Sequence, residues 1–241
     1  MKMQKKIHEV VAIIDRSGSM NGKEEDTIGG INSTFEVLRE NSDESVDTKV
    51  SIKLFDHQEI MLARSIDLKD VKPIERKQYH PRGQTALLDA LGNSLKFFID
   101  KKEEDCSAYD SCTIYVVTDG LENSSEKYNT DKIKKMINDA SDYNIEILYL
   151  GANQDAIFEA SKCGISSKNT LNYFESCGNV RNAYRSAASA SMRHASGSDP
   201  AFLQAERLAS QSFEENSGEN SVVEPPPIRR CRRVSRSSSS N

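Results

Sequence analysis

The stretch from Val10 to Met20 constrains the fold more than any other part of this sequence. It opens with five consecutive apolar residues, most of them β-branched, and no polar residue interrupts them. Such a run predicts a central strand buried on both faces, as in a parallel sheet covered by helices on either side. The run stops at Asp15, and hydroxyl side chains follow at Ser17 and Ser19. Because ligands of open α/β sheets bind at the carboxyl edge, these three side chains are predicted to lie in a binding loop.

This loop offers a hard set of ligand atoms. One carboxylate and two hydroxyls stand together with no Cys or His beside them, and Gly18 between the serines is expected to permit a tight backbone. Oxygen donors of this kind suit Mg²⁺, Mn²⁺ or Ca²⁺ and do not favour zinc. The sequence therefore predicts a site for a divalent cation at the end of the first strand.

The segment from Thr113 to Gly120 repeats this arrangement. A β-branched and aromatic run ends in Asp119 and a glycine, so a second carboxylate is expected at the same edge of the sheet. Between the two acids, Thr85 directly precedes a long apolar helix, and on the residues alone it is interpreted as an N-cap with no relation to a metal. His57 and His80 are interpreted as solvated loop residues and are given no role.

Hydrophobic periodicity predicts the remaining elements. Helices are expected at 23–40, 85–99, 130–144 with Thr130 as the cap, 155–163 and 179–195, and further strands at 49–55, 58–65, 145–150 and 170–173. A tight turn joins the strands at 49–55 and 58–65 into an antiparallel pair. This order predicts an α/β fold: a doubly wound, Rossmann-like, mostly parallel six-stranded sheet with one antiparallel edge strand and helices on both faces.

Length and composition limit the class of protein. The 241 residues suggest one large domain with extensions, and no apolar run approaches the roughly 18 residues of a membrane span. The basic start is followed by an apolar segment too short for a signal peptide, so a cytoplasmic location is expected. The five cysteines are odd in number and lack CxxC spacing, which indicates free thiols: Cys106, Cys112, Cys163, Cys177 and Cys231.

Charge is distributed unevenly along the chain. Residues 228–241 hold five arginines and no acid, so the total formal charge of −5 leaves −10 on the first 227 residues. The acidic body has no basic stripe with interleaved aromatics, which argues against nucleic-acid binding by the folded part. We expect a folded domain at 1–200 with its core at 7–175, a short helix within 201–213, and a disordered Pro/Ser/Arg tail at 214–241.

The separate positions together resemble a known motif, the metal-ion-dependent adhesion site (MIDAS) of the von Willebrand factor A (vWA) family. That site is written as Asp-x-Ser-x-Ser, a distant Thr and a distant Asp. All of its positions are present here in order: Asp15, Ser17, Ser19, Thr85 and Asp119. The resemblance covers residues 7–175, and the sequence around the motif resembles cytoplasmic or bacterial-type members.

The resemblance implies a role for each of these residues. It makes Ser17, Ser19 and Thr85 ligands of the cation, so that Thr85 both caps its helix and faces the metal. It makes Asp15 and Asp119 ligands that bind directly or through water and orient the hydroxyls. The cofactor is expected to be Mg²⁺, with Mn²⁺ or Ca²⁺ as substitutes.

The function implied by the resemblance is that of a protein-interaction module and not of an enzyme. An open position on the cation would bind an Asp or Glu of a partner protein, and an AAA-type ATPase or assembly machinery is the expected kind of partner. No membrane partner is expected, and nucleic acid is assigned only to the basic tail. The alternative is an Mg²⁺-dependent hydrolase or phosphoesterase at the same acids. Against it, the sequence has no Walker-type glycine loop and no well-placed His or Lys base.

Overall fold

The computed structural model describes residues 5–152, 154–174 and 176–211. The strands are β1 (Lys6–Asp15), β2 (Val46–Phe55), β3 (Glu59–Asp67), β4 (Ser111–Thr118), β5 (Ile145–Gly151) and β6 (Thr170–Asn172). The α-helices are α1 (Glu24–Glu40), α2 (Leu87–Glu104), α3 (Thr130–Ala140), α4 (Gln154–Lys162), α5 (Cys177–Ala195) and α6 (Gln204–Ala209). Single turns of 3₁₀ helix lie between several of these elements, the first of them at Gly18–Met20.

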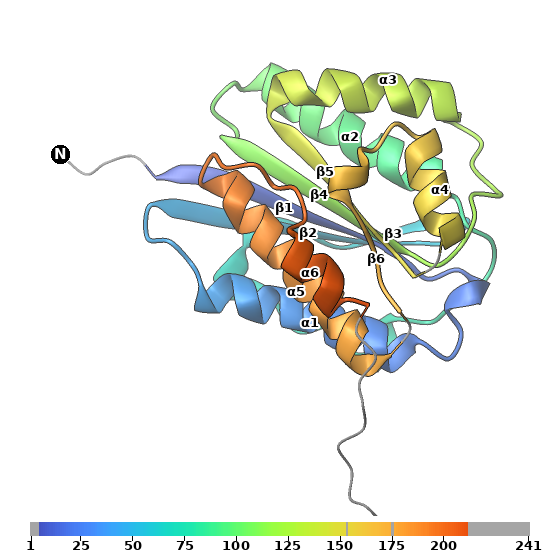
Figure 1. Ribbon diagram of the computed structural model, residues 1–241. Coiled ribbons are helices and arrows are strands. Elements are labelled where there is room, and N and C mark those ends of the chain that lie inside the picture. Colours follow the sequence, from blue (N-terminus) through green and yellow to red (C-terminus); the bar gives the residue numbers. More distant parts are fainter. Residues whose placement is uncertain (1–4, 153, 175, 212–241) are drawn as a thin grey trace, which may run out of the picture.

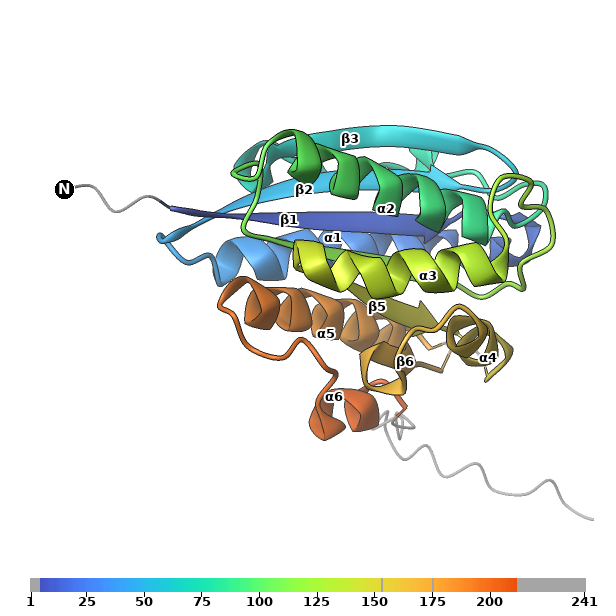
Figure 2. The same ribbon diagram turned by 90° about the horizontal axis from the view of Figure 1, so that it is seen from above.

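The strands form one sheet in the order β3-β2-β1-β4-β5-β6. All neighbouring pairs are parallel except β2 and β3, which are antiparallel at one edge. In Figures 1 and 2, α2 and α3 cover one face of this sheet, whereas α1 and α5 cover the other. The predicted architecture is therefore confirmed. The chain passes from β1 to β2 on one side and later to β4 on the other, which places the switch point of the topology at the carboxyl end of β1.

The central strand β1 is buried on both faces, as its continuous apolar run predicts. Val10, Ala12 and Ile14 belong to the core beneath α1 and α5. Val11 and Ile13 belong to the core beneath α2 and α3. All five side chains are at most 1% exposed. Because both faces are filled by apolar packing, the polar residues that follow Ile14 can only lie at the end of the strand, in the loop that leads to α1.

Two helix caps differ from the prediction. Thr85 is not the cap of α2, because Ala86 occupies that position and makes no side-chain cap. Thr130 is not the cap of α3 but its first residue, and the side chain of Asn129 accepts the hydrogen bond from Lys132 N–H. In both places the prediction took a threonine beside an apolar run as the cap, and the helix boundary differs from it by one or two residues.

The C-terminal part of the described chain packs onto the domain. Helix α6 lies within the predicted range, and Arg207 in it donates hydrogen bonds to the carbonyl oxygens of Thr170, Ser167 and Lys168. Arg193 of α5 pairs with Glu206 of α6 at 2.9 Å. The tail predicted at 214–241 lies outside the described residues. No helix in the described ranges is both long and apolar enough to cross a bilayer.

Candidate metal centre

The two predicted acids and the two predicted serines meet at the carboxyl ends of β1 and β4. Asp15 is the last residue of β1, and Asp119 follows the last residue of β4. The hydroxyl of Ser19 donates to Asp119 Oδ1 at 2.6 Å, and its oxygen lies 3.0 Å from the hydroxyl oxygen of Ser17. The backbone N–H of Ser17 donates to Asp15 Oδ1 at 2.6 Å. Residues 100 positions apart in the sequence thus share one hydrogen-bonded cluster.

Thr85 joins the cluster from a third loop, and Gly120 shows where the oxygens converge. A methyl group on the Cα of Gly120 would lie 3.1 Å from the hydroxyl oxygen of Thr85 and 3.2 Å from that of Ser19. It would lie 3.5 Å from Asp15 Oδ2. Any side chain at this position would therefore crowd the two hydroxyl oxygens and contact the carboxylate oxygen, so the glycine keeps the space next to them open. The oxygens of three separate loops face this one space.

Asp15 is held in the interior by hydrogen bonds on both carboxylate oxygens. Its side chain is fully buried, and Oδ2 accepts a hydrogen bond of 2.6 Å from the hydroxyl of Thr118. The pKa of this carboxyl is raised from 3.8 to about 6: burial is the main cause, the hydrogen bonds from Thr118 and Ser17 oppose the rise, and the negative charge of Asp119 adds to it. In the absence of a cation the ionised form of Asp15 is therefore costly, which is the condition under which a carboxylate gains from binding a metal.

A loop between β4 and α3 fixes the position of Thr85. Asn123 accepts a hydrogen bond from Thr85 N–H at 2.9 Å and donates its own N–H to Thr85 O at 3.0 Å. The first turn of α2 is capped from the same loop, since Glu122 accepts from Leu88 N–H at 2.8 Å and Ser125 from Asp89 N–H at 3.0 Å. The helix is thus capped by side chains distant in the sequence. This leaves the hydroxyl of Thr85 free to face the other oxygens, without the capping role that the prediction gave it.

Further contacts hold the loop of Ser17 to its neighbours. Gly18 N–H donates to Gly83 O at 3.0 Å, and a Cβ at Gly18 would lie 3.3 Å from that oxygen, so the glycine permits a close approach of two backbones. The guanidinium groups of Arg16 and Arg82 each lie 2.9 Å from the buried carboxylate of Asp56. These two ion pairs connect the loop after β1, the turn between β2 and β3 and the loop before α2.

The hydrogen bonds of Glu122 hold the loop after β4 to the first turn of α2, and we call this contact the Glu122 clamp. Its contribution to stability can be measured. Glu122→Ala removes the acceptor of the Leu88, Ser124 and Ser125 N–H groups, and we expect the free energy of unfolding to fall by about 1 to 2 kcal/mol, as for loss of a helix cap. Glu126→Ala is the matched control, because Glu126 is exposed and contributes only its backbone N–H to Asp89. Urea unfolding of both variants measures the difference, and equal stability would show that the clamp is not formed.

Two contributors to this cluster were missed in the sequence. Thr118 bonds Asp15, and the ammonium group of Lys23 forms an ion pair with Asp119 Oδ2. The sequence does contain an indication of the role of Lys23. A cation at the N-terminus of a helix is unfavourable because it faces the positive end of the helix dipole, which suggests that the residue has a partner elsewhere. His57 and His80 are both exposed, as expected for solvated loop residues.

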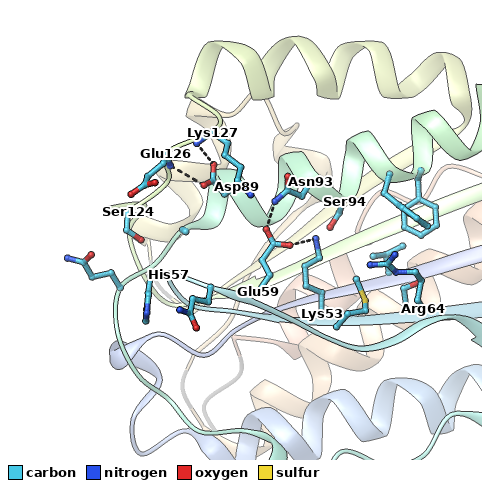
Figure 3. Close-up of a pocket in the computed structure, with 18 residues that line it drawn as sticks. Lys53, His57, Glu59, Arg64, Asp89, Asn93, Ser94, Ser124, Glu126 and Lys127 are labelled. Carbon is cyan, nitrogen blue, oxygen red and sulfur yellow. Dashed lines mark hydrogen bonds and ion pairs between the residues drawn. The ribbon is translucent and has the colours of Figure 1, made fainter.

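Nowhere in the described residues do three His, Cys, Asp or Glu side chains gather as a metal site. The candidate centre itself has only two acids among five predicted ligands. A cleft of about 770 Å³ lies between β2, β3, α2 and the loop after β4 (Figure 3), and none of the five candidate ligands lines it. Its most buried charge is already paired, since Lys53 lies 2.7 Å from Glu59 and donates to Ala90 O. Its other acids do not gather as a metal site within the described residues.

Comparison with known proteins supports the fold. No protein-family model matches the sequence, and no curated protein matches it. Among solved structures, the pilus adhesin SpaC from Lactobacillus rhamnosus GG is similar with a TM-score of 0.59 and 11% identity, over 80% of this chain and 30% of that one. Proximal thread matrix protein 1 from the mussel byssus gives a TM-score of 0.56 and 13% identity, over 76% and 46% of the two chains.

A structure described as von Willebrand factor type A from Catenulispora acidiphila is also similar. Its TM-score is 0.53 at 14% identity, over 78% of this chain and 43% of that chain. The chain thus spans less than half the length of each of these three structures. The architecture is that of a vWA-type α/β domain, and identities this low establish the fold alone.

Proposed function

We propose that this chain is a divalent-metal-dependent protein-interaction module whose ligand is an acidic side chain of a partner. One observation carries the proposal: hydroxyl and carboxylate oxygens from three loops surround one space at the carboxyl edge of a vWA-type sheet. Asp15, Ser17, Ser19, Thr85 and Asp119 are the proposed ligand set.

The chemistry of this set fits a hard cation. All of its donor atoms are oxygens, which suit Mg²⁺ and Mn²⁺, and Ca²⁺ is the further candidate. The hydroxyl of Ser19 donates its proton to Asp119 and can accept that of Ser17, which leaves one lone pair of Ser19 for a cation. Asp119 in this way orients a neutral ligand. Three of the five ligand groups are neutral hydroxyls, so they would neutralise little of the charge of a bound cation. The remaining positive charge would attract an anionic ligand from outside the chain.

The surroundings of the set suit a protein ligand. Ser19 is exposed, so the cluster is reached from solvent at that residue. Leu121, which follows Gly120 in the sequence, is 48% exposed. A carboxylate at the cation with apolar contact around it is a pattern typical of the centre of an interface. An AAA-type ATPase or a component of assembly machinery remains our proposal for the partner, and the cytoplasm for its location.

We further propose that the chain is not an enzyme. A hydrolase at the same acids needs a group that activates water, and His57 and His80 are engaged elsewhere: His57 Nδ1 lies 3.2 Å from Asp56, and His80 bonds Lys77 O. The lysine at the site, Lys23, forms an ion pair with Asp119 and in that form has no lone pair to accept a proton from water. Steady Mg²⁺-dependent hydrolysis of a generic phosphoester, abolished in Asp15→Ala, would overturn this assignment.

A pull-down with the full chain tests the proposed function. The bait is wild type, with Mg²⁺ or with excess EDTA, and Asp119→Ala in Mg²⁺ serves as the matched variant. We expect a partner that is retained only by the wild type in Mg²⁺. Partners held equally in EDTA and by the variant would contradict a role of the cation in binding.

A further inference from the structure

Lys23 brings a positive charge to the proposed site. Its ammonium group pairs with Asp119 Oδ2, while Asp119 Oδ1 accepts the hydroxyl of Ser19. The two oxygens of one carboxylate are thus divided between a proposed metal ligand and a lysine. The side chain of Asp119 is only 3% exposed, whereas that of Lys23 is 29% exposed. The pair therefore lies at the boundary between the oxygen cluster and solvent.

The position of Lys23 in α1 is unfavourable for local reasons. It is the N-cap residue, where Ser, Thr, Asp or Asn would accept a hydrogen bond from the helix, and its side chain makes no cap. A cation there also faces the positive end of the helix dipole. Such a conflict with local preference is expected where a residue serves a site. The long-range partner of Lys23, 96 residues away, is a residue of the proposed ligand set.

We propose that Lys23 determines what the site binds: it weakens the hold on the cation and strengthens the hold on the anionic ligand. This inference rests on the proposed function. The charges of two carboxylates and one divalent cation cancel. Lys23 therefore adds a positive charge beside the loaded site, which favours a carboxylate ligand, and in the empty site its ion pair with Asp119 opposes the attraction of the cation.

Lys23→Met separates these two effects, because it keeps the length of the side chain and removes the charge. We expect the variant to bind Mn²⁺ alone about tenfold more tightly, a factor that corresponds to about 1.4 kcal/mol. We expect its Mn²⁺-loaded form to bind a simple carboxylate more weakly by a similar factor. Calorimetry with Mn²⁺ measures the first affinity, and broadening of the fluorine NMR signal of trifluoroacetate measures the second.

Lys101→Met is the matched control. Lys101 is 28% exposed and lies 2.5 Å from the fully buried Glu9, so the pair resembles that of Lys23 in burial. Glu9 is roughly 20 Å from Asp15 along β1, at about 3.3 Å a residue. The control changes the net charge of the chain equally, and it should leave both affinities near those of the wild type. Lys23→Arg keeps the charge and should do the same.

The outcomes distinguish the inference from the proposed function. A wild type that binds no Mn²⁺ contradicts the proposed function and, with it, this inference. A wild type that binds Mn²⁺ while Lys23→Met changes neither affinity overturns the inference alone. Weaker Mn²⁺ binding in Lys23→Met also overturns it, because Lys23 would then serve only to orient Asp119. Tighter Mn²⁺ binding together with weaker trifluoroacetate binding supports it, provided that circular dichroism shows a folded variant.

Discussion

Asp15→Asn is expected to stabilise the metal-free domain at pH 7.5 by about 3 kcal/mol, since each unit of pKa shift corresponds to about 1.4 kcal/mol. The shift is from 3.8 to about 6, and its main cause is burial of the carboxyl. Asparagine stands in for the protonated acid, which the folded protein tolerates better than the charged one. A residue at the centre of the proposed site would thus lower the stability of the empty protein.

The sign of this effect can be followed with pH. The folded-state pKa is raised, so the wild type loses stability once the pH is high enough for Asp15 to ionise in the unfolded chain, while the folded protein still binds the proton. The penalty is absent below 3.8, grows between 3.8 and about 6, and is complete above that range. Urea unfolding in metal-free buffer at pH 4 and pH 7.5 should therefore show a higher free energy of unfolding for Asp15→Asn than for the wild type only at pH 7.5. Asp139→Asn, on the exposed side of α3, is the control. A variant less stable than the wild type at pH 7.5 would instead give the Asp15 carboxylate a structural role.

Val116→Asp is expected to leave the domain largely unfolded. Val116 lies in the middle of β4 with no exposed surface, and its neighbours across the sheet are Ile13 and Tyr149. A carboxylate placed there has no cationic partner among these neighbours. Buried acids of this kind shift their pKa by about 3 to 5 units, which corresponds to roughly 4 to 7 kcal/mol. That is comparable to the whole stability of a typical domain, about 5 to 15 kcal/mol.

Asp119→Ala provides the comparison for Val116→Asp. It changes a residue only three positions further along the chain, just beyond the end of β4, and leaves the core intact. Circular dichroism and melting in EDTA should show a folded Asp119→Ala and an unfolded Val116→Asp. If both variants unfold, the carboxyl edge of the sheet contributes to stability far more than its hydrogen bonds suggest.

The sheet could be predicted from the sequence because its signals are local. The unbroken apolar run of β1 required two covered faces, and the structure places alternate residues under different helices. The antiparallel pair of β2 and β3 followed from the short turn at Asp56 and His57. The caps of α2 and α3 could not be predicted in the same way, since a shift of one residue decides which side chain is the cap.

In the candidate site too, some features could be predicted from the sequence and others could not. The positions of the acids followed from where apolar strands end, and Asp15 and Asp119 do lie at neighbouring strand ends. The clamp from Glu122 to the first turn of α2 joins residues 34 positions apart, and no periodic pattern marks it. The same holds for the ion pair between Lys23 and Asp119. Contacts of this kind depend on which loops the fold brings together, so they appear only in three dimensions.

Calorimetric titration of the full chain with Mg²⁺ and with Mn²⁺ tests the central claim most directly. The wild type should bind one cation per chain, and the double variant Ser17→Ala with Asp119→Ala should bind none, because a neutral ligand and a charged one are removed together. The bound cation should also raise the melting temperature of the wild type and leave that of the double variant unchanged. Equal binding by the two proteins would place the cation elsewhere and contradict the account.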